Sequence, residues 1–154
     1  MWFYKNIEVT PELYQQYREE GFIGFVYVVT DNVNGMKYLG KKLWVSTRKL
    51  APLKGQKRKR TKVVETDWMT YYGSSEEVQK LVQEHGDKRF SREILQLCKT
   101  KGELNYVEAM LQFKLEVLLH PEVWYNGIIQ CKIHRNHAKS VQKTLDYTKK
   151  DDTK

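Results

Sequence analysis

Residues 22–40 read Phe-Ile-Gly-Phe-Val-Tyr-Val-Val-Thr-Asp-Asn-Val-Asn-Gly-Met-Lys-Tyr-Leu-Gly and carry the clearest structural signal of the chain. The first nine residues are mostly β-branched or aromatic, and the run is too short for a core helix, so it predicts a strand. Asn34-Gly35 then favours the positive φ angles of a tight turn. Met36–Gly40 would form the return strand. The sequence therefore predicts a β-hairpin.

Helices and one further strand are predicted around this hairpin. Thr10-Pro11-Glu12 combines an N-cap hydroxyl, a proline at the first helical position and an acid, which is typical of a helix start. The remaining elements are a capped helix over about 74–86, a strand over 90–98 and a long helix over about 103–119. This order predicts an α/β (α+β) domain in which helices flank a small, mostly antiparallel three-stranded sheet.

The composition excludes several classes of protein. With 154 residues, 40% of them hydrophobic, the chain can form one domain with a modest core and is not wholly disordered. No apolar run approaches the roughly 20 residues of a membrane-spanning helix, and no secretory signal follows the first residues. Cys98 and Cys131 make no disulfide framework. We expect a cytoplasmic protein with no membrane partner.

The net charge of +8 is concentrated in two segments. Residues 41–64 hold ten Lys or Arg and no acid, and residues 132–154 hold seven Lys or Arg against three Asp. The rest of the chain has ten basic and sixteen acidic residues, a net charge of −6. This layout favours a polyanion such as nucleic acid as partner, although a solvated charge run has the same composition. Residues 41–64 show little periodicity and predict a short helical turn followed by a mobile basic loop.

Two tyrosine motifs resemble the signature of the GIY-YIG nucleases. Gly24-Phe-Val-Tyr27 and Lys37-Tyr-Leu-Gly40 place two tyrosines eleven residues apart, with the predicted turn between them. The chain also resembles a phage-encoded, homing-endonuclease-like branch of that family through four later segments, which are Tyr71–Ser75, Phe90–Leu95, Glu108-Ala109 and Tyr125-Asn126. The resemblance covers residues 22–130 and implies a DNA endonuclease, located in the host cytoplasm if the chain is phage-encoded.

The resemblance also implies a division of the chain into three parts. Residues 1–21 would be an N-terminal helical extension, and residues 22–130 the nuclease domain with a basic insertion at about 41–66. Residues 131–154 would be a basic tail. Trp44 and Trp68 flank the insertion and could either stack on bases or pack the insertion onto the domain.

Phosphodiester hydrolysis needs an activated water and positive charge beside the reacting phosphate. The resemblance implies that Tyr27 or Tyr38 activates the water. An unperturbed phenol, with a pKa of about 10, is a poor base, so we expect nearby cations, Lys41 or Lys42 together with a metal, to lower that pKa. The family carries an arginine on its first helix, and Arg48 stands at the matching distance. It would bind a phosphate oxygen, although another cation of the insertion could replace it.

Glu108 is the candidate metal ligand. It falls within the apolar face that Leu104, Val107 and Leu111 form on the long predicted helix, and a carboxylate against a core needs a compensating cation. The resemblance implies a single Mg²⁺ or Mn²⁺ held by this one carboxylate, water and phosphate. Asn126 matches an asparagine of the family that would orient the metal-bound water or the glutamate.

The remaining cations of the insertion are expected to contact the backbone of double-stranded DNA. These are Lys41, Lys49, Lys54, Lys57, Arg58, Lys59, Arg60 and Lys62. A lone active site would nick one strand, so double-strand cleavage would require a homodimer or two encounters. A non-catalytic nucleic-acid-binding module on the same scaffold is the main alternative, and a factor that docks an acidic protein is a third. Cys131, His134 and His137 are spaced for zinc but supply only three ligands.

Overall fold

The computed structural model describes residues 1–138 and 141. A five-stranded sheet forms its centre, in the order β2-β1-β7-β3-β4. The strands are β1 (Trp2–Tyr4), β2 (Ile7–Glu8), β3 (Gly24–Asp31), β4 (Lys37–Leu43) and β7 (Phe90–Cys98). β1 runs parallel to β7, and the other neighbouring pairs are antiparallel. The predicted α+β class is confirmed, whereas the sheet is larger than the predicted three strands.

The two additional strands come from the N-terminal segment, for which only a helix was predicted. Trp2 and Tyr4 are buried and Phe3 is exposed, which is the alternation of a strand. Lys5 and Asn6, both at positive φ, form the turn between β1 and β2. A strand of three residues is too short for its periodicity to be recognised from sequence. Residues 2–8 therefore belong to the same sheet as the hairpin.

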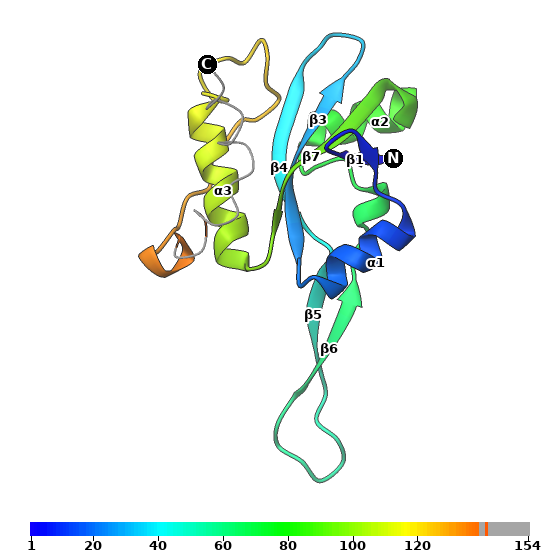
Figure 1. The fold of residues 1–154 in the computed structure, drawn as a ribbon, viewed down its shortest axis with the longest axis vertical. Helices are drawn as coiled ribbons and strands as arrows, with labels where there is room; N and C mark the ends of the chain where they lie inside the picture. Colours follow the sequence, from blue (N-terminus) through cyan, green and yellow to red (C-terminus); the bar gives the residue numbers. More distant parts are fainter. Residues whose placement is uncertain (139–140, 142–154) are drawn as a thin grey trace.

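Three helices cover the two faces of this sheet (Figure 1). α1 (Pro11–Glu19) and α2 (Glu76–His85) pack against the face that carries Trp2, Phe25 and Tyr27. α3 (Lys101–Lys114) packs through Leu104, Val107 and Leu111 against the opposite face. The hydroxyls of Thr10, Ser75 and Thr100 cap their N-termini. α3 ends earlier than predicted, because the chain turns at Glu116, whose φ is 53°.

The basic segment forms a two-stranded antiparallel ribbon, not the predicted helical turn and loop. β5 (Val45–Leu50) pairs with β6 (Arg60–Glu65), and Figure 1 shows this ribbon projecting from the body. Valine and threonine recur in both segments and favour strands, although the many cations between them obscure this pattern in the sequence. Trp44 and Trp68 at its base are fully buried, so they pack the ribbon onto the domain.

Short single-turn helices complete the described chain, and they are η1 (Trp68–Thr70), η2 (Asp87–Arg89) and η3 (Arg135–Ala138). The predicted basic tail lies mostly beyond residue 138, outside the described residues. Within the described part of the chain, no helix combines the length and apolar character that a membrane span requires.

A buried carboxylate locks the turn of the central hairpin. The connection is wider than a two-residue turn: the Asp31 N–H donates to the Met36 carbonyl, and Gly35 alone has positive φ. Asp31 is fully buried and accepts two hydrogen bonds of 2.8 Å from Arg89 and one of 2.8 Å from the Tyr125 hydroxyl. This network joins the hairpin to β7 and to the segment after α3.

Burial alone would raise the pKa of Asp31, but the hydrogen bonds from Arg89, Tyr125 and the Val33 N–H lower it to about 2. The folded pKa lies below the unfolded value of 3.8, so the stabilisation is present above about pH 4 and is lost as the pH falls toward 2. We expect Asp31→Asn to lower the free energy of unfolding by about 2 kcal/mol at pH 7.

Urea unfolding between pH 3 and 7 measures this effect. The difference between Asp31→Asn and wild type should narrow as the solution is acidified. Asp87→Asn, which changes an exposed carboxylate, is the control and should stay close to wild type. A difference that does not vary with pH would show that the charge of Asp31 is not what stabilises the turn.

Candidate active site

The central hairpin brings the two motif tyrosines onto one face of the sheet. Tyr27 of β3 lies opposite Gly40 of β4, and Tyr38 lies opposite Val29, so both phenols project toward α1 and α2. Their ring centroids are 6.4 Å apart. Tyr27 is 1% exposed, whereas Tyr38 is half-buried. The predicted approach of the two tyrosines across the hairpin is therefore present.

Gly40 lets the Tyr27 phenol reach the edge of the sheet. A Cβ at position 40 would lie 2.5 Å from the Tyr27 hydroxyl and 2.8 Å from its ring carbon Cζ. Gly73, at φ 107°, also lies against the tyrosines, because a Cβ there would be 2.9 Å from the Tyr38 ring and 3.3 Å from the Tyr27 hydroxyl. β4 is the last strand of the sheet, so the two glycines leave the phenols room beside an open edge.

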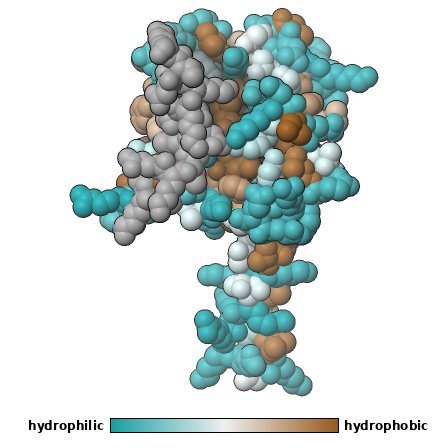
Figure 2. Space-filling model, in the orientation of Figure 1, coloured by the Kyte–Doolittle hydropathy of each residue, from teal (hydrophilic) through white to brown (hydrophobic). Residues whose placement is uncertain are grey.

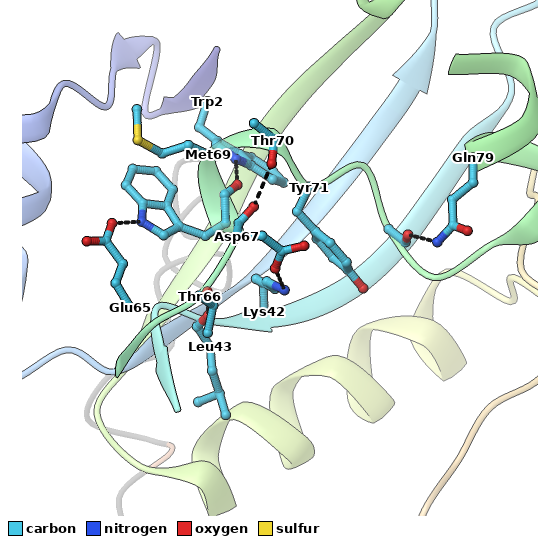
Figure 3. Close-up of polar contacts among 12 residues, drawn as sticks. Trp2, Lys42, Leu43, Glu65, Thr66, Asp67, Met69, Thr70, Tyr71 and Gln79 are labelled. Carbon is cyan, nitrogen blue, oxygen red and sulfur yellow. Dashed lines mark hydrogen bonds and ion pairs between the residues drawn. The ribbon is translucent and has the colours of Figure 1, made fainter. Parts of the chain in front are cut away.

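Four hydroxyl groups gather in one pocket at this edge, those of Tyr27, Tyr38, Tyr71 and Ser74. The Tyr38 hydroxyl and Ser74 Oγ are 2.6 Å apart, and the ring centroids of Tyr27 and Tyr71 are 6.1 Å apart. Gln79 of α2 donates to the Gly73 carbonyl, which holds this loop in place (Figure 3). Tyr71 and Ser74 had no predicted role. The sequence contained a signal for both residues, because the Tyr71–Ser75 segment resembles a segment of the family. That resemblance did not assign a function to either side chain.

The environment of Tyr27 favours its neutral form. Burial raises the pKa of this phenol well above its ordinary value, and the Tyr71, Tyr38 and Glu108 side chains add to that effect. The predicted lowering of a tyrosine pKa involved a lysine together with a metal and stays a prediction. In the protein alone, burial dominates for Tyr27, and both lysines are paired with carboxylates, Lys41 with Glu108 and Lys42 with Asp67.

Lys41 and Glu108 meet on the other side of the edge strand. Lys41 points to α3, where its Nζ is 2.8 Å from Glu108 Oε2 and donates at 2.7 Å to Asn105 Oδ1. The Glu108 side chain is 17% exposed, and its Oε1 accepts a hydrogen bond of 3.3 Å from Gln112 Nε2. The nearly buried carboxylate is thus compensated by the Lys41 ammonium, whereas the cation predicted beside it was a metal.

Lys42 points to the tyrosine face instead. Its ammonium lies 3.8 Å from the centre of the Tyr71 ring and bonds to Asp67, as Figure 3 shows. The hydrogen bond from Lys42 lowers the pKa of Asp67, so this carboxylate is charged at neutral pH. The predicted common parity of Tyr38 and Lys42 is confirmed by the register of β4. Lys41, which was assigned to the DNA contacts, is the lysine beside Glu108.

Both polar atoms of the Asn126 amide form hydrogen bonds with the edge strand β4. Its Oδ1 accepts from the Leu39 N–H at 2.9 Å, and its Nδ2 donates to the Leu39 carbonyl at 2.7 Å. Gln112 also donates to that carbonyl, at 3.2 Å, while it contacts Glu108. The contact with the glutamate that was predicted for Asn126 is thus made by Gln112, and Asn126 fixes the backbone between Tyr38 and Gly40.

Three of the predicted catalytic residues, Lys42, Asn126 and Arg48, do not line the pocket, and Arg48 lies outside the body of the domain. It lies on β5 of the ribbon, not on a helix, and its side chain is exposed. It does not line the pocket that contains the tyrosines and Glu108. The resemblance implied a helix at this position, whereas Arg48 lies on a strand of the projecting ribbon, so its sequence distance from Tyr38 does not imply proximity.

The site is a pocket of about 290 Å³ that crosses the sheet edge. Its polar lining consists of Tyr27, Tyr38, Lys41, Tyr71, Ser74, Glu108, Gln112 and Gln130. Hydroxyls thus face a carboxylate and an ammonium group across one strand. Within the described residues no three His, Cys, Asp or Glu side chains form a metal-ligating group, so a zinc site at Cys131 and His134 has no support there. The side chain of His137 lies outside the described residues.

The pocket thus combines one carboxylate and one ammonium group with several hydroxyls at the last strand of the sheet. Residues 2–129 match the family described as "Putative endonuclease segE, GIY-YIG domain", and the chain belongs to this GIY-YIG family. The match begins at residue 2 and so includes β1. No curated protein and no solved structure matches the chain.

The contact between Gly40 and Tyr27 can be tested directly. Gly40→Ala should lower the free energy of unfolding by about 1–3 kcal/mol and displace the Tyr27 phenol, because the added methyl group overlaps its hydroxyl. Chemical denaturation and the near-ultraviolet circular dichroism of the tyrosines measure the two effects. Gly127→Ala is the matched control, since nothing lies within 4 Å of the added Cβ. Equal stability of the two variants would contradict the close approach.

Proposed function

We propose that the protein is a DNA endonuclease that hydrolyses phosphodiester bonds with a single divalent cation, Mg²⁺ or Mn²⁺. The observation that carries the proposal is the pocket in which Tyr27, Tyr38 and Glu108 face one another across the edge of β4. Glu108 would hold the cation, which when bound supplies Lewis-acid activation of water and phosphate. Its side chain fits this task, because it is oriented by Gln112 and opens to the pocket.

Tyr27 and Tyr38 have different roles toward the attacking water. Tyr27 is buried and neutral, so it acts as a hydrogen-bonding partner that orients the attacking water. Tyr38 is half-buried, and its hydroxyl oxygen is the better placed to accept the proton of that water. Its own proton passes to Ser74 Oγ, 2.6 Å away, and from there toward solvent. The water oxygen then bonds to phosphorus as the bond to the leaving sugar oxygen breaks, and that oxygen takes up a proton from solvent water.

The two lysines supply positive charge on either side of the edge strand. Lys41 sits beside Glu108 and would bind a nonbridging phosphate oxygen when substrate enters. Lys42 lies against the Tyr71 ring and would supply positive charge on the tyrosine side of the strand. A single pocket of this kind cuts one strand, so we propose that the protein nicks double-stranded DNA and that double-strand breaks require a second copy.

Nicking of supercoiled plasmid in the presence of Mg²⁺ tests this function. We expect Glu108→Gln to abolish nicking and Tyr38→Phe to lower its rate by about 10²–10⁴-fold, because the phenol hydroxyl takes part in proton transfer. Glu84→Gln on α2 and Tyr106→Phe on α3 are matched controls outside the pocket and should retain activity. DNA binding by the wild type without metal-dependent nicking would contradict the proposal and support the non-catalytic binding module.

The ion pair between Lys41 and Glu108 generates a second, separable prediction. The ammonium competes with a metal for the same carboxylate oxygen, so Lys41→Met should bind Mn²⁺ up to about fivefold more tightly, as expected for the loss of a partly exposed ion pair. The same variant should nick more slowly, because its phosphate contact is lost. Electron paramagnetic resonance of free Mn²⁺ measures the affinity. Weaker Mn²⁺ binding in Lys41→Met would contradict the assignment of Glu108 as the ligand.

A further inference from the structure

The folded domain leaves most of the surface of the ribbon formed by β5 and β6 exposed to solvent. Its two strands pair only with each other, and most of their side chains are exposed. An isolated two-stranded hairpin is at best marginally stable, yet this one is fixed firmly at its base. Trp44 is buried there, and the Thr66 N–H donates to the Trp44 carbonyl at 2.9 Å. The domain thus holds the exposed ribbon, residues 45–65 and hereafter the arm, in a defined direction.

The arm is strongly cationic. Residues 45–65 contain eight Lys or Arg and the single acid Glu65. All eight cations are exposed, and none of them forms an ion pair with a carboxylate in the described part of the chain. Figure 2 shows the arm as a mainly hydrophilic projection below the body. Its charge is therefore available to a polyanion.

The strand register sorts these charges by face. Arg48 pairs with Lys62 and Leu50 with Arg60, and both pairs share a face with Ser46 and Val64. The opposite face carries Lys49 as its one cation in the paired strands, opposite Thr61, and ends at the acidic Glu65. In the paired strands, one face of the arm thus carries three cations and the other carries one. A charge run that served only solubility would not require this asymmetry.

The cationic face leads into the candidate active site. Ser46, at its base, lines a cleft of about 370 Å³ together with Lys41, Lys42, Lys101 and Asn105. Lys41 also lines the pocket that holds Glu108. A polyanion that follows the cationic face toward the body therefore passes Ser46 and reaches the basic side chains that line this cleft.

We propose that the ribbon enters the major groove of double-stranded DNA, with the face of Arg48, Arg60 and Lys62 toward the DNA. The major groove is about 12 Å wide and admits a two-stranded ribbon, whereas the minor groove is about half as wide. Six residues of β5 span about 20 Å, which corresponds to about six base pairs. The proposal relies on the proposed function only for double-stranded DNA as the substrate.

Binding measured in EDTA tests the face assignment without any cleavage. The variant R48Q/R60Q/K62Q removes three charges from the cationic face. The control K49Q/K80Q/K88Q also removes three charges, one from the opposite face of the arm and two from the body of the domain. We expect the slope of log affinity against log salt on a 30-base-pair duplex to fall by about 2–3 for the first variant and by less than 1 for the control. Equal decreases would overturn the proposal, because bulk charge would then explain the binding.

Methylation by dimethyl sulfate tests the groove, since guanine N7 lies in the major groove and adenine N3 in the minor groove. Saturating wild-type protein should reduce N7 methylation of the duplex and leave N3 methylation unchanged, and R48Q/R60Q/K62Q should restore N7 methylation. Protection of N3 alone, or unchanged N7 protection in that variant, would overturn the proposal. These results do not depend on nicking, so a failed nuclease assignment and a failed arm assignment are distinguishable.

Discussion

The candidate site depends on the passage of the Tyr27 phenol beside Gly40 at the edge of the sheet. A sheet normally separates the side chains on its two faces, and here the tyrosines lie on the α1 and α2 face while Glu108 lies on the α3 face. They meet because β4 is the last strand and because position 40 has no side chain to fill the edge. A central strand at this position would keep the two halves of the pocket apart.

An exposed edge strand must nevertheless be held in register if it is to position reacting groups. Asn126 bonds to both the N–H and the carbonyl of Leu39, in the way that a neighbouring strand would. Gln112 of α3 donates to the same carbonyl and to Glu108. The Asp31 network fixes the far end of the hairpin and holds Tyr125, the residue before Asn126. The edge strand is therefore held in register by side-chain amides at Leu39 and by a short parallel bridge between Lys37 and Trp124.

Sequence patterns predicted those parts of the molecule in which local signals are long and uninterrupted. The hairpin, the strand over residues 90–98 and the approach of Tyr27 to Tyr38 follow from β-branched runs and from parity along a strand. β1 was missed because three residues carry no measurable period, and the ribbon because cations obscure its valines and threonines. Parity also placed Lys42 with Tyr38, but the partner of Lys41 depends on how α3 packs, which no local pattern contains.

The ribbon and the pocket are parts of one continuous segment, and this has a consequence for where DNA would be cut. β4 carries Tyr38, Gly40 and Lys41, ends at Leu43 and passes through the buried Trp44 directly into β5. Since both ends of the arm are hydrogen-bonded to the body at Trp44 and Thr66, the distance from the arm to Glu108 is set by the fold. A duplex held by the arm would therefore present a phosphate at a fixed offset to the pocket, and the β4–β5 junction would determine that offset whether or not any base is read.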